Sequence, residues 1–185
     1  MIALVLGGAD CLQADLDEAA KLVDPHRCTI VAANDAGVYW PHRLDHWVTM
    51  HPNELPYRIQ RRRTMGYPDG YTTWTRPYPP GMKNREELCD RTISGYNGSS
   101  GLVAVGVAIE TGHRAILCGI PMDVRPHFNR EGVWEKAESY RERWVDLHDH
   151  LAPLVRSMAG WTRGQFGVPT KEWVDAALGR RVASV

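Results

Sequence analysis

The stretch SGYNGSSGLVAVGVAIETGHRAILCGIPMD, residues 94–123, gives the clearest indication of the fold. A loop of small residues precedes an almost wholly apolar segment, 102–112, and a second apolar run follows at 114–120. We predict a buried helix that stops at Gly112, followed by a buried strand that leads to Asp123. A strand without polar alternation is typical of a parallel sheet whose two faces are both covered by helices.

Four further apolar runs have the same character and are also predicted to be strands. They lie at residues 2–6, 29–34, 45–50 and 154–159. Helix-like segments separate the strands or follow them, at 15–23, 171–178 and 132–154, the last as one long amphipathic helix broken at Pro153. This alternation predicts an α/β, doubly wound domain, in which a mainly parallel sheet carries helices on both faces.

The chain length is that of one domain, and we expect a single domain over residues 1–185. Segment 53–91 contains five prolines and is predicted to be an irregular segment that covers one end of the sheet. Within it, one short strand is plausible at 71–75. Residues 124–131 are predicted to form a short, lid-like loop.

The overall charge excludes several classes of partner. Lysine plus arginine and aspartate plus glutamate each number 22, so nothing draws the whole chain to nucleic acid or to an anionic membrane. No apolar run is long enough to span a bilayer, and the first residues lack the features of a signal peptide. We expect a soluble, cytoplasmic protein with a small-molecule ligand, and a homo-oligomer is compatible with the sequence.

The four cysteines show no pair at the close spacing of a zinc or redox motif. Cys28 and Cys118 lie in or beside predicted strands, where a free thiol packs as a small apolar group. Thiol-bound metal and disulfides are therefore not expected.

Polar residues and glycines follow the predicted strands, where an open parallel sheet binds its ligands. In chain order, and one strand after another, they are Gly7, Gly8 and Asp10, then Asn34 and Asp35, then His51, then Asp123, then Trp161 and Thr162. This coincidence is the main argument from the residues for a ligand site.

Each of these positions also has a purely structural interpretation. The Gly7-Gly8 pair either admits a ligand close to the backbone or simply forms a tight turn, and the two interpretations have similar weight. The amide of Asn34 suits a sugar hydroxyl or a phosphate oxygen, although an asparagine also starts turns. Gly98, Ser99, Ser100 and Gly101 precede a helix, and we favour an anion site there because four small residues exceed what a cap requires.

Two other features carry possible chemistry. His127 follows Asp123 and suits a general base for a sugar hydroxyl, although a loop histidine without a role is at least as common. The arginines at 61–63 are typical of a solvated face, with phosphate coverage as the alternative. No lysine motif of a phosphate loop is present.

The order of these motifs resembles that of small bacterial sialyltransferases that use a cytidine-monophosphate sugar donor. More broadly, it resembles the Rossmann-like glycosyltransferases of the motility-accessory-factor and pterin-pyrophosphokinase-like group. The matching positions are Gly7 to Asp10 for the opening loop, Asn34, the His51-Pro52 step, the helix start at Ser100-Gly101, Asp123 and the final loop 157–161. The chain departs from the pattern at Gly8 and His51, where the family has asparagine, and in its short segment 124–131.

The resemblance implies nucleotide or nucleotide-sugar binding and glycosyl transfer, with the nucleotide-sugar as donor and no obligatory cofactor or metal. His127 and Asp123 would be the catalytic residues, and residues 98–101 would stabilise the departing phosphate. One alternative is a magnesium-dependent pyrophosphokinase or phosphotransferase with Asp10, Asp35 and Asp123 as ligands. Another is a non-catalytic nucleotide-binding module. Trp47, Trp74 and Trp161 are candidates for stacking on a base, although most tryptophans are expected in the core.

Overall fold

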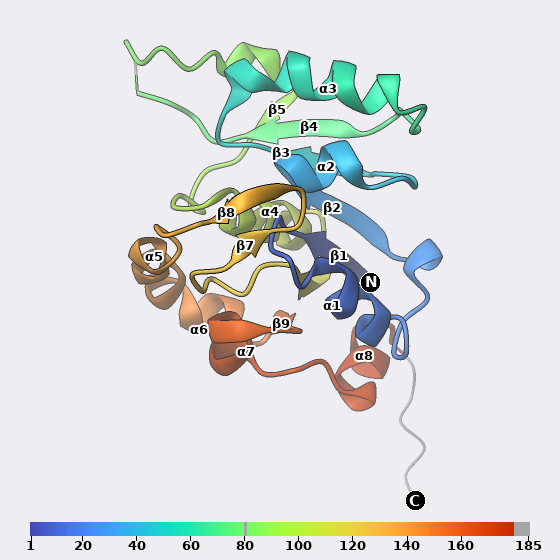
Figure 1. The fold of residues 1–185 in the computed structure, drawn as a ribbon. Coiled ribbons are helices and arrows are strands. Elements are labelled where there is room, and N and C mark those ends of the chain that lie inside the picture. The colour runs from blue at the N-terminus through green and yellow to red at the C-terminus, as the bar shows by residue number, and fades with distance from the viewer. Residues whose placement is uncertain (80, 180–185) are drawn as a thin grey trace, which may run out of the picture.

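The centre of the molecule is a seven-stranded sheet in which all neighbouring strands are parallel (Figure 1). The computed structural model describes residues 1–79 and 81–179. The strand order is β5-β4-β3-β2-β1-β6-β9. The strands are β1 (Ile2–Leu6), β2 (Thr29–Ala33), β3 (His46–Val48), β4 (Thr72–Thr75), β5 (Arg91–Thr92), β6 (Arg114–Cys118) and β9 (Val155–Ser157). The predicted class, a Rossmann-like α/β fold with a parallel sheet, is confirmed.

Helices cover both faces of the sheet, as predicted. One face packs against α1 (Leu12–Ala19), α2 (Asp35–Tyr39), α3 (Leu55–Thr64) and α8 (Lys171–Ala177). The other packs against α4 (Ser100–Glu110), α5 (Arg141–Asp146), α6 (His148–Leu151) and α7 (Gly160–Phe166). Alternate residues of β1 belong to the two separate cores, and all of them are buried. This explains why the run at 2–6 has no polar alternation.

The predicted long helix at 132–154 is wrong. Its first residues belong to β8 (Arg130–Val133), which pairs antiparallel with β7 (Pro126–His127) to form a hairpin. Gly132 has a φ of +91°, which a helix does not accommodate. A 3-10 turn at Glu138–Tyr140 and the two short helices α5 and α6 follow. The segment 124–131, predicted as a lid-like loop, therefore contains most of this hairpin.

The segment 53–91 is more regular than predicted. It contains α3, which was not predicted, and β4, which confirms the short strand expected at 71–75. Strand β5, also not predicted, begins at the last residue of the segment. Helix α3 buries only Leu55 and Arg62, so its sequence shows almost no apolar periodicity. Helix α7 was also not predicted, because it has only seven residues and buries only Thr162 and Phe166.

Arg62 is completely buried, whereas its neighbours Arg61 and Arg63 are exposed. Its Nη1 donates to the carbonyl oxygens of Gly37 and Trp40 at 2.8 and 2.6 Å. Its other donors bind two loop carbonyls, Nη2 that of His42 at 2.8 Å and Nε that of Pro68 at 3.0 Å. The prediction of a solvated face is therefore wrong for Arg62, which satisfies carbonyls at the end of α2.

Cys28 and Cys118 are buried free thiols, as the sequence predicted. Burial raises the pKa of Cys28 to about 11 and that of Cys118 well above its ordinary value. Both thiols are thus protonated at neutral pH.

Among the described residues, no helix has the length and apolarity to cross a membrane.

His46 makes the stability of the fold dependent on pH. Its Nδ1 accepts a hydrogen bond from the indole Nε1 of Trp74 at 3.2 Å, and burial lowers its pKa. Because the folded-state pKa lies below the unfolded one, the stabilisation is full above pH ~6.5 and is lost as pH falls through the folded-state pKa. We expect the melting temperature to fall between pH 7.5 and pH 5, and to fall less in His46→Gln, when followed by circular dichroism. Identical pH profiles of the two proteins would contradict this assignment.

Candidate functional site

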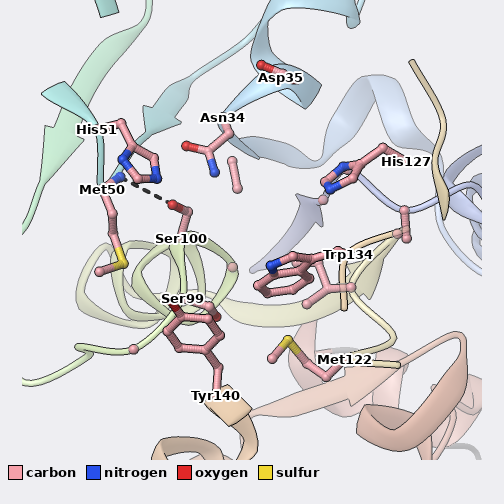
Figure 2. A pocket seen from close by; sticks show the side chains of 18 of the residues that line it. Asn34, Asp35, Met50, His51, Ser99, Ser100, Met122, His127, Trp134 and Tyr140 are labelled. Carbon is pink, nitrogen blue, oxygen red and sulfur yellow. Dashed lines mark hydrogen bonds between the residues drawn. The ribbon is translucent and has the colours of Figure 1, made fainter. Parts of the chain in front are cut away.

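A cavity of about 460 Å³ lies at the carboxyl edge of the sheet. It is bordered by residues that follow β1, β2, β3, β4 and β6, by the start of α4 and by the β7–β8 hairpin (Figure 2). Its size is typical of a site for a small organic molecule. The sequence-predicted residues that line it are Gly7, Gly8, Asn34, Asp35, His51, Gly98, Ser99, Ser100, Gly101, Asp123 and His127.

Asp10, Trp161 and Thr162, also predicted as ligand-binding residues, do not line this cavity. Asp10 forms an ion pair with Arg125 at 2.9 Å and lines a second cavity beside α1 and α2. The backbone N–H of Trp161 donates to the Asp123 carboxylate. The hydroxyl of Thr162 is buried and donates to a backbone carbonyl at 2.6 Å.

Asn34 has a strained backbone at the end of β2. Its φ of 49° and ψ of −121° are unusual for a residue other than glycine. The neighbouring strand holds this conformation, since the Asn34 N–H donates to the carbonyl of Val48 at 2.9 Å and its own carbonyl accepts from the Trp47 indole at 2.8 Å. Strain of this kind persists where the surrounding structure imposes it, and it is concentrated at functional sites.

The side chain of Asn34 has a fixed orientation. Its Oδ1 accepts hydrogen bonds from the Thr49 hydroxyl at 3.0 Å and from Arg58 Nη1 at 3.2 Å. Because a guanidinium only donates, the oxygen of the amide must face Arg58. The amide nitrogen is therefore left as a donor that points into the cavity (Figure 2).

Arg58 supports this end of the site and was not predicted from the sequence. Its side chain is only 11% exposed and forms ion pairs with Glu54 at 2.7 Å and with Asp35 at 3.4 Å. The other oxygen of Asp35 accepts from the Asn129 side chain of the hairpin at 3.0 Å. Glu54 and Arg58 are four residues apart, the spacing of an ion pair on one helix face, and this spacing is the local signal in the sequence for both α3 and Arg58.

The start of α4 forms one wall of the cavity. The Ser99 hydroxyl caps the helix by accepting from the Leu102 N–H at 3.2 Å, and the Ser100 Oγ accepts from the Met50 N–H at 3.2 Å (Figure 2). The first N–H groups of a helix have no partner within it and lie at the positive end of its dipole. Those of Ser100 and Gly101 are thus donors at the cavity wall.

The glycines of the site have structural reasons of their own. A Cβ on Gly7 would lie 2.3 Å from the Gly119 carbonyl oxygen, and one on Gly8 would lie 2.8 Å from His127 Nδ1. A Cβ on Gly101 would meet Ile120 at 3.1 Å, and Gly98 has a φ of +136°. Packing and backbone conformation therefore explain the small residues at 98–101. Within this segment, the indication of a ligand is that the start of α4 lines the cavity.

The two residues predicted to be catalytic differ in their surroundings. The Asp123 carboxylate accepts hydrogen bonds from Arg141 at 2.8 Å and from the backbone N–H of Trp161 at the start of α7. These contacts give it a structural role in joining α5 and α7 to the end of β6. His127 lies in β7, pairs with Ala9 through an isolated bridge, and presents its ring to the cavity (Figure 2).

The three carboxylates named for a magnesium site do not converge. Asp10 pairs with Arg125, Asp35 with Arg58 and Asp123 with Arg141. Within residues 1–79 and 81–179, no group of three or more His, Cys, Asp or Glu side chains is arranged to hold a metal ion.

Two aromatic residues that the sequence did not predict for the site, Trp134 and Tyr140, also line the cavity. Trp134 and Tyr140 stack with ring centroids 5.7 Å apart and an interplanar angle of 26°. Trp47 and Trp74, which were considered for base stacking, are buried in the cores. Trp134 directly follows β8, whereas the sequence predicts a helix there, so its place in the site could not be predicted.

Compared with known proteins, the chain matches no family model, no curated protein and no solved structure.

Proposed function

We propose that this protein binds a nucleotide or nucleotide-sugar at the carboxyl edge of its sheet, as a small glycosyltransferase-like enzyme. One observation carries the proposal: the oriented amide of the strained Asn34 and the first turn of α4 present N–H donors to the same cavity. A phosphate group accepts from donors of both kinds, and the positive end of the helix dipole favours its charge.

The phosphate is proposed to lie between Asn34 and the N–H groups of Ser100 and Gly101. The bond from the Met50 N–H to Ser100 Oγ leaves the hydroxyl hydrogen of Ser100 available to the ligand. These fixed donors would stabilise the charge that develops as the phosphate departs. Since Asp10, Asp35 and Asp123 each bind an arginine, the geometry supports this metal-independent arrangement over the magnesium-dependent alternative.

The nucleobase is proposed to stack at the Trp134–Tyr140 pair. Base stacking on an aromatic ring contributes roughly 1–3 kcal/mol. We expect Trp134→Ala to weaken binding by about 1–2 kcal/mol, roughly 5- to 30-fold, because Tyr140 remains. Calorimetric titration with AMP, CMP, GMP and UMP measures this loss. Trp40→Ala, in the second cavity, is the control, and equal affinities of Trp134→Ala and the wild type would argue against the base site.

For the transfer reaction, His127 is proposed to take the proton of an acceptor hydroxyl. The acceptor oxygen then attacks the anomeric carbon as the bond from that carbon to the phosphate oxygen breaks. Incubation with nucleotide-sugars, followed by mass spectrometry, tests this step. Release of free nucleotide together with a glycosylated acceptor is expected, whereas recovery of the unchanged donor in the presence of a panel of sugar acceptors would leave only a binding module.

A further inference from the structure

Three arginines line the cavity, and only one of them is without a carboxylate partner in the described chain. Arg58 is paired with Glu54 and Asp35, and Arg125 is paired with Asp10. Arg76, which follows β4, has no ion pair among the residues that the structure describes. Its full charge is therefore presented to the cavity.

None of the acidic side chains that line the cavity forms an ion pair with Arg76. Asp35 and Glu54 are bound by Arg58, and Asp123 is bound by Arg141. Each cavity-lining carboxylate thus contacts an arginine other than Arg76, and Asp35 and Glu54 share the one charge of Arg58. Among the arginines of the described lining, Arg76 alone contacts no carboxylate.

The guanidinium of Arg76 is also short of hydrogen bonds. Its Nε is buried, and it finds no acceptor within residues 1–79 and 81–179. A buried N–H of a charged group without an acceptor is costly, and in native proteins such a group is usually explained by a ligand or by water.

Arg76 is held in place by an aromatic support. Its Cζ lies 4.3 Å from the centroid of the Tyr78 ring, and the Tyr78 hydroxyl donates to the carbonyl of Met50. Met50 in turn donates its N–H to Ser100 at the start of α4. The guanidinium is thus fixed relative to the proposed phosphate position.

The spacing of the strands relates these two positions. Met50 follows β3 and Arg76 follows β4, and neighbouring strands lie about 4.8 Å apart. The aromatic pair proposed for the base lies near the end of β6, because Arg141, next to Tyr140, donates to the carbonyl of Met122, which follows that strand. Strands β3, β2 and β1 separate β6 from β4, so Arg76 is on the side away from the base. Arg76 therefore follows the strand next to the one whose Met50 binds Ser100.

We infer that Arg76 binds a second phosphate, so that the ligand is a nucleoside diphosphate or a group linked through one, rather than a monophosphate. The first phosphate lies at α4 and Asn34, and the second lies at Arg76 without a bridging metal. This inference rests on the proposed function and names the ligand class of the same site.

The test compares the monophosphate and the diphosphate of the same nucleoside, so that the contribution of the base to the binding free energy is the same for both. AMP and ADP, CMP and CDP, GMP and GDP, and UMP and UDP are titrated calorimetrically in EDTA into the wild type and Arg76→Gln. We expect the wild type to prefer at least one diphosphate roughly 10- to 150-fold, and Arg76→Gln to abolish that preference while keeping its affinity for the monophosphate. Arg76→Lys should keep part of it. Arg85→Gln, an exposed arginine outside the cavity, should behave as wild type.

Three results would overturn the inference. They are no diphosphate preference in the wild type, an equal loss for both members of each pair in Arg76→Gln, and a preference that Arg76→Gln retains. If monophosphates bind in any of these cases, the proposed function stands without it. If none of the eight nucleotides binds, the proposed function fails as well.

Discussion

Arg62→Met is expected to lower the free energy of unfolding by about 3–5 kcal/mol, because each carbonyl left without its hydrogen-bond donor costs about 1–3 kcal/mol where it is buried. The guanidinium of Arg62 binds four backbone carbonyls from α2 and the loops around it. Methionine fills much of the volume but donates no hydrogen bond, so these buried or partly buried carbonyls would lose their donor. Urea denaturation followed by circular dichroism measures the change.

Arg63→Met is the matched control, one position along the same helix. Arg63 is exposed, and its ion pair with Asp69 at 2.9 Å lies in solvent, so its removal should cost less than about 1 kcal/mol. Similar midpoints for the two variants would show that the buried guanidinium does not hold α2 and α3 together.

Asn34→Gly is expected to weaken nucleotide binding roughly 10- to 150-fold, since it removes a hydrogen bond to a charged phosphate. Glycine adopts a φ of 49° without strain, so stability should change by no more than about 1 kcal/mol despite the bonds lost to Thr49 and Arg58. The substitution therefore separates binding from folding. Calorimetry and thermal unfolding on the same preparation give the two quantities.

Asn97→Ala provides the control for Asn34. Asn97 is exposed, close to α4 and outside the cavity lining, and its substitution should leave both affinity and stability near wild type. If the Asn34→Gly protein bound nucleotide as tightly as the wild type, the Asn34 amide would not be a ligand-binding group.

The parts of the fold that could be predicted are those in which burial alone decides the element. β1, the residues of β6 after Arg114 and the central residues of α4 are apolar because other elements enclose them. Helix α3 was missed for the opposite reason, since its inward residues include an arginine whose partners are backbone carbonyls of other segments. Nothing local in the sequence reveals such partners.

The error at 132–154 has a different cause. Ala137, Trp144 and Leu151 are all buried, and Trp134 and Tyr140 pack beside one core, which produces a spacing of three and four residues. Ala137 lies in a turn, Trp144 in α5 and Leu151 in α6, so the period reflects burial and not one continuous helix. The pattern therefore concealed the hairpin that borders the cavity.

The site could be predicted only where a residue follows a strand. That rule brought Asn34 and Asp123 to one cavity, because all the strands of the sheet end at the same edge. Arg58 and Trp134 reach the cavity from a helix and a hairpin that had not been recognised. Thr162 also follows a strand, but its hydroxyl is turned inward to a backbone carbonyl.

The most direct measurement follows the backbone amides of Ser100 and Gly101 by ¹⁵N NMR during titration with ADP, CDP, GDP and UDP. With at least one nucleotide these two resonances should shift strongly, together with the side-chain amide of Asn34, and the matching nucleoside without phosphate should leave all three nearly unmoved. Unshifted Ser100 and Gly101 resonances at saturating nucleotide, or shifts confined to the second cavity around Tyr39 and Phe128, would contradict a phosphate site at the start of α4.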